Sequence, residues 1–165
     1  MSKFVMGSDP IPVAIALGSN LGDRRGHLEY AIGALTRDLV DIRVSSFRDT
    51  QPVGVSAGHG TYLNAALVGR TCLLPRDLLE RLWLVEGERG RTRPYPMAPR
   101  TLDLDLILYG DVIVKEDGLT VPHPRFRERE FVLDPLAEIA PDMVDPVTGR
   151  TIASLAQTLR SGERF

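Results

Sequence analysis

The chain has 165 residues, of which 43% are hydrophobic and 25% are charged, and its formal net charge is −2. This balance is typical of one globular domain with a core of its own, and it argues against a disordered chain or a strongly basic nucleic-acid-binding chain. The single cysteine, Cys72, cannot form an internal disulfide, and no Cys/His cluster indicates structural zinc.

No apolar run approaches the ~20 residues needed to cross a bilayer, so we expect no membrane contact. Residues 1–12 lack a basic flank followed by a long apolar stretch, so we expect no secretory signal and a cytoplasmic location. We interpret residues 1–165 as a single, monomeric domain in which residues 1–11 form a flexible leader.

The first half of the chain predicts three strands and one helix. The apolar run 13–17 predicts a buried strand that ends in a glycine-bearing turn, and Asp23 is placed to cap the helix that follows. The predicted buried stripe of this helix is Leu28, Ala31, Ile32 and Leu35. Alternation predicts strands at 41–50 and 62–71, with a Pro/Gly-rich loop at 51–60 between them.

In the second half, Pro75 opens a helix that Gly90 is expected to stop, and a loop with three prolines follows. The predicted buried stripe of this helix is Leu78, Leu79, Leu82 and Val85. Residues 102–109 predict a strand, and residues 112–114 and 119–121 could pair as a hairpin. The tail, 131–159, predicts one or two short helices broken at Pro135, Pro141 and Pro146.

The element order β-α-β-β-α-β predicts an α+β fold of the ferredoxin-like, split βαβ type. In this arrangement a mostly antiparallel sheet has helices packed on one face.

The segment 100–106 carries the strongest chemical signal. On a strand, Leu102, Leu104, Leu106 and Leu108 would share one face, whereas Asp103 and Asp105 would share the other. Two carboxylates about 6 Å apart repel by roughly 3 kcal/mol at an effective dielectric constant near 20, so a cation should lie close to them. Either Arg100 in a structural ion pair or a hard divalent metal such as magnesium fits, and a half-exposed strand with no ligand also explains the alternation.

Arginines gather just before this segment. The stretch from Arg89 to Arg100 holds four arginines, both end residues included, and no acid. Guanidinium groups beside paired carboxylates are what the transfer of a polyphosphate group needs, which favours an enzyme of that class. The chain contains no Gly-x-x-x-x-Gly-Lys-Ser/Thr loop, so it is not a P-loop enzyme.

Six short motifs, in this order, resemble one family, that of the 6-hydroxymethyl-7,8-dihydropterin pyrophosphokinases. The resemblance runs from about residue 13 to residue 140. The motifs are Ala16-Leu17-Gly18-Ser19-Asn20-Leu21-Gly22, Thr50-Gln51-Pro52-Val53-Gly54, Tyr62-Leu63-Asn64-Ala65, Gly90-Arg91, Ala98-Pro99-Arg100-Thr101-Leu102-Asp103-Leu104-Asp105 and Leu119-Thr120-Val121-Pro122-His123-Pro124.

The resemblance implies an ATP-dependent pyrophosphokinase of folate biosynthesis. Such an enzyme moves pyrophosphate from ATP to the hydroxymethyl group of the pterin and releases AMP, with two Mg²⁺ ions bridging the phosphates. It implies that Asp103 and Asp105 bind the metal ions, and that Arg91, Arg100 and Asp105 are catalytic.

The same resemblance assigns the two substrates to further residues. The implied pterin-binding residues are Thr50, Val53, Tyr62, Asn64 and Phe131. The implied ATP-binding residues are Arg93, Leu106, Thr120, His123 and Arg129. Without the resemblance, the two aromatic residues would be read as ordinary core, and the histidine as a turn residue between two prolines.

The chain departs from the family around the nucleotide. Pro96-Met97-Ala98-Pro99-Arg100 replaces an Arg-Trp-Gly-Pro-Arg stretch, Trp83 stands where a glutamine is frequent, and Gly118 stands where some relatives have arginine. Two other functions stay open at this point: a single-stranded RNA-binding module on the sheet, and a relative that binds nucleotide without catalysis.

Overall fold

The computed structural model describes residues 9–50, 61–90 and 101–162. Its main sheet has the strand order β2-β4-β1-β5, and β3 also pairs with β4; every described pairing in this sheet is antiparallel. The five strands are β1 (Ile11–Ser19), β2 (Val40–Val44), β3 (Arg48–Thr50), β4 (Tyr62–Thr71) and β5 (Asp103–Tyr109). Because β4 lies between β1 and β2, the predicted split βαβ arrangement is confirmed.

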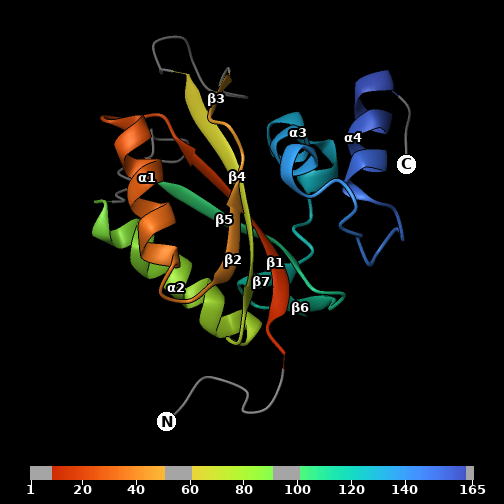
Figure 1. The fold of residues 1–165 in the computed structure, drawn as a ribbon, viewed down its shortest axis with the longest axis horizontal. Coiled ribbons are helices and arrows are strands. Elements are labelled where there is room, and N and C mark those ends of the chain that lie inside the picture. The colour runs from red at the N-terminus through yellow and green to blue at the C-terminus, as the bar shows by residue number, and fades with distance from the viewer. Residues whose placement is uncertain (1–8, 51–60, 91–100, 163–165) are drawn as a thin grey trace.

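Helices cover both faces of the sheet, whereas the sequence predicted cover on one face only (Figure 1). On one face lie α1 (Arg24–Leu35) and α2 (Pro75–Glu88), whose leucines pack against Val13, Ile15 and Leu17 of β1. On the other face lie α3 (Glu130–Ile139) and α4 (Ile152–Ser161), which pack against small residues such as Ala14 and Ala16. In the parts of the chain described, no helix combines the length and the apolar character needed to span a bilayer.

The predicted strand at 41–50 is divided into β2 and β3. Asp41 adopts a positive φ of 55°, and the register of β2 against β4 shifts between Val40 and Arg43. Past β2, the Ser46 backbone N–H and hydroxyl both donate to Glu138 of α3, at 2.8 and 2.7 Å. This bond to another layer draws the chain out of the strand before β3 begins.

A β-bulge in β5 corrects the predicted leucine stripe. Ile15 of β1 faces Leu106 and Ala14 faces Leu108, so Ile107 is the extra residue. Leu102, Leu104 and Leu106 remain on the α1/α2 face, but Leu108 packs with Ile107 in the core beneath α3 and α4. The alternation therefore holds through the acidic segment and changes phase after it.

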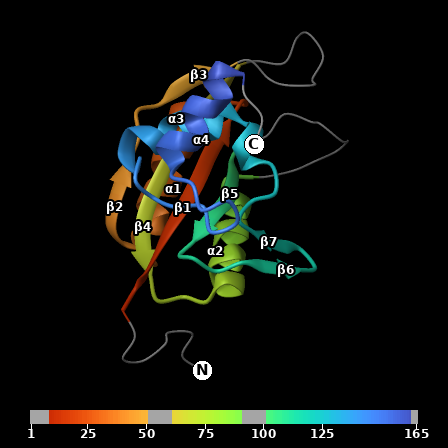
Figure 2. The same cartoon turned by 90° about the vertical axis from the view of Figure 1, so that its right-hand side faces the viewer.

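The predicted hairpin forms from β6 (Val114–Glu116) and β7 (Leu119–Val121), so its first strand begins later than expected. The strands join through a two-residue turn in which Gly118 has a φ of 76°. Figure 2 shows the hairpin beside α2 and β5. A short 3₁₀ helix, η1 (Phe126–Glu128), then leads into α3.

Pro135 lies inside α3, so the predicted break at this residue is wrong. Proline removes one helical hydrogen bond, but Val132, Leu133 and Leu136 of the same helix are all buried in the core, and this packing keeps the helix continuous. Pro141 and Pro146 do lie between α3 and α4, as predicted.

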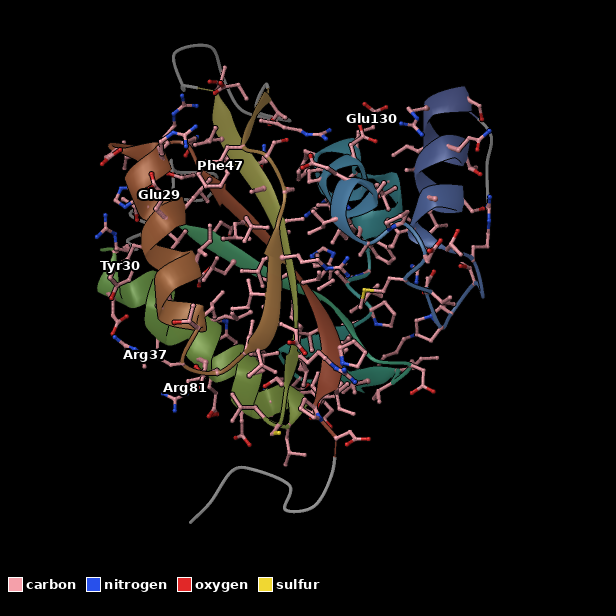
Figure 3. All side chains as sticks on the ribbon, in the orientation of Figure 1. Glu29, Tyr30, Arg37, Phe47, Arg81 and Glu130 are labelled. Carbon is pink, nitrogen blue, oxygen red and sulfur yellow. The ribbon has the colours of Figure 1, made fainter. Side chains whose placement is uncertain are left out.

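The C-terminal end of α2 is held to α1 by polar contacts. Tyr30 projects from α1, as labelled in Figure 3. Its hydroxyl donates to Glu88 at 2.7 Å, and the Arg89 guanidinium lies 4.7 Å from the centre of its ring. The hydrogen bond to the Glu88 carboxylate raises the pKa of Tyr30 above its ordinary value. Arg89 also donates to His27 at 3.0 Å, so the end of α2 is fixed to α1.

The connection between α3 and α4 is organised around a fully buried carboxylate, Asp145. Arg127 donates to both of its oxygens, at 2.7 and 3.0 Å, and Val147 and Thr148 donate to it as well. Burial raises the pKa of Asp145, but these hydrogen bonds and the Arg127 charge outweigh burial, so the pKa lies below its ordinary value.

Replacement of this carboxylate should destabilise the fold. Asp145→Asn removes a fully buried carboxylate and leaves the partly buried Arg127 charge without its partner, so we expect a loss of about 3 kcal/mol in the free energy of unfolding at neutral pH. Because the folded pKa is lowered, the stabilisation is complete above the ordinary value of 3.8 and is lost as the pH falls below it. Urea unfolding of the two proteins should therefore differ most at neutral pH and converge in acid.

Glu116→Gln is the control, because Glu116 forms an exposed ion pair with Arg76 at 3.1 Å. Removal of that pair should cost less than about 1 kcal/mol. If Asp145→Asn were as stable as this control at neutral pH, the proposed role of Asp145 would be wrong.

Candidate functional site

Asp103 and Asp105 lie on the sheet face that α3 and α4 cover in part. Both are half-buried, whereas Leu102, Leu104 and Leu106 between and beside them are buried on the opposite face. The strand thus presents two carboxylates, separated by one residue, toward the same side. Oxygen donors of this kind suit a hard divalent cation such as Mg²⁺.

The acidic segment is fixed from α2 by a buried glutamate. Glu86 is only 1% exposed, and its carboxylate accepts a hydrogen bond of 2.7 Å from the backbone N–H of Leu104. Leu104 lies between the two aspartates, and β5 is at the edge of the sheet. The bond therefore satisfies an edge N–H that none of the described strands pairs with, and it holds the backbone that carries both aspartates.

One row of residues crosses three strands of the sheet. Gly18 of β1 is the register partner of Asp103 on one side and of Asn64 on the other. Directly paired residues point to the same face, so the carboxylate and the amide flank a position without a side chain. The backbones of Asp103 and Asn64 are two strand spacings apart, about 10 Å.

The absence of a side chain at Gly18 keeps this face open. A Cβ atom there would lie 3.1 Å from Asn64 Oδ1 and 3.8 Å from Tyr62 Cδ1. Gly18 therefore leaves space directly above the strand, between the acidic pair and the polar side chains of β4.

Three of the predicted pterin-binding residues come together on β3 and β4. Tyr62 and Asn64 share the face of β4 that carries Ala66, and the Asn64 side-chain N–H donates to the Thr50 hydroxyl. Asn64 is 6% exposed. The hydrogen bond orients its amide, which can both donate and accept.

Phe131 belongs to α3, which packs against β4 on this same face. Its ring is partly buried and lies 5.6 Å from the guanidinium carbon of Arg129, which precedes the helix. The structure thereby places a predicted pterin-binding residue next to a predicted ATP-binding residue.

A cavity of about 300 Å³ adjoins the acidic pair. Its walls come from α2, from β5, from the hairpin strand β7 and from the turn after it. The residues predicted to bind metal or ATP that line it are Asp103, Asp105, Leu106, Thr120 and His123. The sequence placed these residues in two distant motifs, and the fold brings them to one cavity.

His123 is held at this cavity by its backbone and by its ring. Its N–H donates to the Ile107 carbonyl at 2.9 Å, and its Nδ1 accepts from the Arg125 N–H at 3.2 Å. Burial and then the Arg129 charge lower its pKa to about 4, whereas the Asp103 carboxylate acts in the opposite direction. His123 is therefore neutral at pH 7, and Arg129 and Asp103 both lie within electrostatic reach of it.

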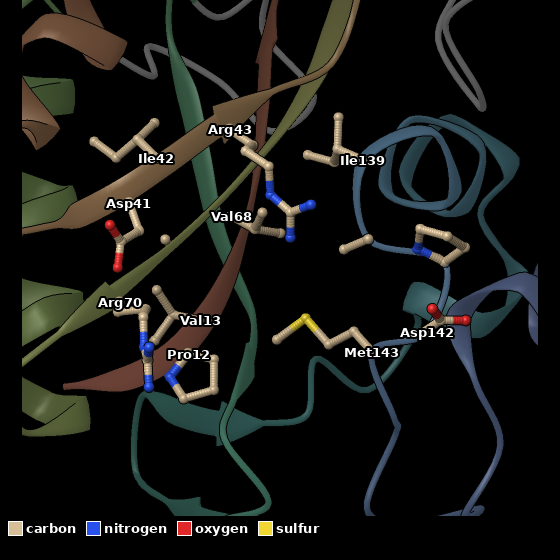
Figure 4. Close-up of a pocket in the computed structure, with 13 residues that line it drawn as sticks. Pro12, Val13, Asp41, Ile42, Arg43, Val68, Arg70, Ile139, Asp142 and Met143 are labelled. Carbon is tan, nitrogen blue, oxygen red and sulfur yellow. The ribbon is translucent and has the colours of Figure 1, made fainter. Parts of the chain in front are cut away.

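A larger groove of about 720 Å³ lies elsewhere on the molecule (Figure 4). Arg43 of β2, Arg70 of β4 and Met143 project into it, and it contains none of the predicted site residues. Its strand residues come from β2, β4 and β1, whereas the smaller cavity is bounded by β5, so the two cavities lie toward opposite edges of the sheet.

Four predicted site residues lie outside the described residues: Val53, Arg91, Arg93 and Arg100. Their roles stay predictions from the sequence. Within the ranges that the structure describes, no three His, Cys, Asp or Glu side chains gather as metal ligands. The aspartate pair fits magnesium, because this ion commonly takes one or two carboxylates and completes its shell with substrate oxygens and water.

Sequence reasoning missed the roles of Glu86 and Gly18 in the site, and it noted Trp83 only as a departure from the family around the nucleotide. Glu86 and Trp83 both line the smaller cavity, yet on the sequence they are an acid and an aromatic residue of an amphipathic helix. Their spacing relative to Leu79 places the three on one side of α2, which was the available signal. Gly18 was read as part of a turn, whereas it is a paired residue of β1.

The neutral state of His123 should make stability depend on pH. The pKa of His123 is about 4 in the folded protein, against an ordinary value of 6.5. The stabilisation that comes from its neutral ring is therefore fully present above pH 6.5 and is lost as the pH falls toward 4. Between pH 7 and pH 5, the wild type should lose about 1–2 kcal/mol more unfolding free energy than His123→Gln. Denaturant unfolding of both metal-free proteins measures this difference, and equal pH slopes would contradict the assignment.

Comparison with known proteins shows the family to which the chain belongs. A family model described as 7,8-dihydro-6-hydroxymethylpterin-pyrophosphokinase matches residues 14–141. The chain is 42% identical over 145 residues to 2-amino-4-hydroxy-6-hydroxymethyldihydropteridine pyrophosphokinase of Synechocystis, covering 87% of the chain and 73% of that relative. It is 45% identical over 127 residues to the Bacillus subtilis protein of the same name, covering 76% and 75%.

Solved structures agree in fold. The HPPK-DHPS of Plasmodium falciparum superimposes with a TM-score of 0.74 at 14% identity, over 95% of this chain and 44% of that one. The chain thus spans less than half of that larger protein, and at this identity the likeness concerns the fold alone. The family match, the two bacterial relatives and the arrangement of acids and amide on the sheet agree: the chain belongs to the 7,8-dihydro-6-hydroxymethylpterin-pyrophosphokinase family.

Proposed function

We propose that Asp103 and Asp105 hold magnesium for pyrophosphoryl transfer, with ATP in the smaller cavity and the pterin over Gly18. As a member of its family, the chain is a pyrophosphokinase that transfers pyrophosphate from ATP to the hydroxymethyl group of 6-hydroxymethyl-7,8-dihydropterin in folate synthesis. The observation that carries the residue assignment is the row Asp103–Gly18–Asn64 across three strands.

The row explains how two substrates can meet. A flat ring above Gly18 would have its polar edge at the Asn64 amide and its other end toward the aspartates of β5. The open position at Gly18 supports this placement, because a Cβ atom there would press on Asn64 Oδ1. The hydroxymethyl oxygen would then point to the place where the polyphosphate is held, which is the positioning that phosphoryl transfer requires.

Tyr62 and Phe131 are proposed to contact the two faces of the pterin ring. Tyr62 shares the strand face of Asn64, and Phe131 belongs to a helix that packs on that same face. Thr50 acts through Asn64, because its hydroxyl accepts the amide N–H and so decides which amide edge is presented.

The smaller cavity is proposed as the ATP site. Magnesium, when bound, would neutralise negative charge on the polyphosphate. Leu106 and Thr120 would contact the nucleotide from β5 and β7, and the neutral His123 ring can hydrogen-bond to it without adding charge. Arg129 supplies positive charge at the boundary with the pterin site.

Other roles stay proposals from the sequence. They are catalysis by Arg91, Arg100 and Asp105, binding by Val53 and Arg93, the use of two magnesium ions, and a monomeric single-domain state. Asp105 is the member of the pair nearer the Ile107 bulge, and its register partner is Ala16. Its carboxylate therefore has only a small side chain beside it on β1.

The metal assignment is tested by Asp105→Asn, which keeps the side-chain volume and removes the charge. Turnover should fall at least about 100-fold, because charge stabilisation at the reacting phosphates would be lost. Release of AMP in the presence of both substrates and a series of magnesium concentrations measures this loss. The free energy of unfolding should change by less than about 1 kcal/mol, because Asp105 is only half-buried.

Asp111→Asn is the matched control, because Asp111 is an exposed carboxylate just beyond the end of β5. It should leave turnover and the magnesium dependence unchanged. Near-normal turnover by Asp105→Asn would refute the assignment of the metal site.

The pterin assignment is tested at Asn64. Asn64→Ala should weaken pterin binding about tenfold or more, because a buried amide contact is lost, and should leave the affinity for a non-hydrolysable ATP analogue nearly unchanged. Asn64→Asp keeps the shape of the side chain, yet it removes the amide donor and should weaken pterin binding too. Calorimetric titration with each ligand separately gives both affinities; an equal loss for both ligands would indicate a structural role instead.

A further inference from the structure

Trp83 is the only tryptophan of the chain, and 47% of it is exposed. Tryptophan has the largest apolar side chain, and tryptophan residues are highly buried on average. Trp83 lies on α2 and lines the cavity of about 300 Å³ beside the acidic pair. A large aromatic surface that faces a concave site, and is left open there, is available to a ligand.

The position of Trp83 is fixed relative to the aspartates. Trp83 and Glu86 are three residues apart, so they lie on the same side of α2. Glu86 is bonded to the Leu104 N–H at 2.7 Å, between Asp103 and Asp105. One turn of helix therefore separates the indole from the residue that anchors the acidic segment.

The lining of the cavity is of two chemical kinds. Asp103, Asp105 and Glu86 contribute carboxylates, whereas Leu79, Trp83 and Pro124 contribute apolar surface. A nucleoside triphosphate has the same two-part character, because a charged polyphosphate is joined to a flat and weakly polar base. If the phosphates bind at the aspartates, the base would contact the apolar residues of the cavity lining.

We propose that Trp83 stacks against the purine base of ATP and sets the preference of this enzyme for purine nucleotides. The inference rests on the proposed position of ATP in this cavity. An indole overlaps more ring surface with a purine than with a pyrimidine, so the contact favours the larger base. Trp83 thus acts in substrate binding, separate from the charge stabilisation at β5.

Leu84, the next residue of α2, provides a control that distinguishes base stacking from the loss of any exposed apolar side chain. Leu84 is 53% exposed and does not line the cavity. Both residues present apolar surface to solvent on α2, but of the two only Trp83 lines the cavity beside the acidic pair. Leu84→Ala is therefore the control for any effect of removing exposed apolar surface from this helix.

The test compares two probes that divide ATP into its parts. AMP carries the base with one phosphate, and inorganic tripolyphosphate with magnesium carries the phosphates without a base. Loss of one base–aromatic stack weakens binding by about 5- to 150-fold. Trp83→Ala should weaken AMP binding by at least about fivefold and leave tripolyphosphate binding unchanged, Trp83→Phe should retain most of the AMP affinity, and Leu84→Ala should change neither.

A second readout comes from the wild type. Because Trp83 is the only tryptophan, AMP should change the intrinsic tryptophan fluorescence more than CMP does at equal saturation. Unchanged AMP affinity in Trp83→Ala, or an equal loss for AMP and tripolyphosphate, would overturn the proposal.

Asp105→Asn distinguishes this proposal from the one on which it rests. It should weaken tripolyphosphate binding and leave the response of Trp83 fluorescence to AMP in place. If Asp105→Asn left tripolyphosphate binding intact, the metal assignment would fail, whereas the AMP result on Trp83 would still decide the stacking proposal.

Discussion

The backbone of β5 between Asp103 and Asp105 is held from both sides, and the site depends on this restraint. On one side it pairs with β1 in register, with Gly18 opposite Asp103 and Ala16 opposite Asp105. On the other side the buried Glu86 accepts the Leu104 N–H. Since side chains alternate along a strand, burying the leucines commits both carboxylates to the opposite face. A shift of one residue would exchange the two sets, so core packing and the placement of the acids are the same constraint.

The two faces of β1 differ in a way that makes room for substrates. Toward α1 and α2 the strand presents Val13, Ile15 and Leu17, and toward α3 it presents Ala14, Ala16 and then Gly18. Small side chains allow α3 to approach the sheet, and the series ends in a residue with no side chain, next to Asn64. The open space therefore results from a decrease in side-chain size along one strand.

Much of this arrangement could be predicted from the sequence, because it depends on periodicity and on local capping. The acidic segment is a short strand with period two, Asp23 accepts the Gly26 N–H at the start of α1, and Pro75 opens α2.

The errors occur where distant groups override a local pattern. Glu138 of α3 divides a predicted strand by bonding Ser46, a bulge turns Leu108 to the other face, and core packing carries α3 through Pro135. Likewise, no local rule shows that His123 lies within reach of Asp103 or that Glu86 holds Leu104. The roles of the site residues remain predictions, because they depend on ligands.

The central claim is that the aspartate pair of β5 binds magnesium together with the polyphosphate, beside a pterin that lies over Gly18. A crystal structure with magnesium, a non-hydrolysable ATP analogue and the pterin tests it directly. The account predicts metal ions coordinated by Asp103 and Asp105 and by phosphate oxygens, with the pterin edge at Asn64. Carboxylates paired only with guanidinium groups, with no metal ion between them and the phosphates, would contradict it.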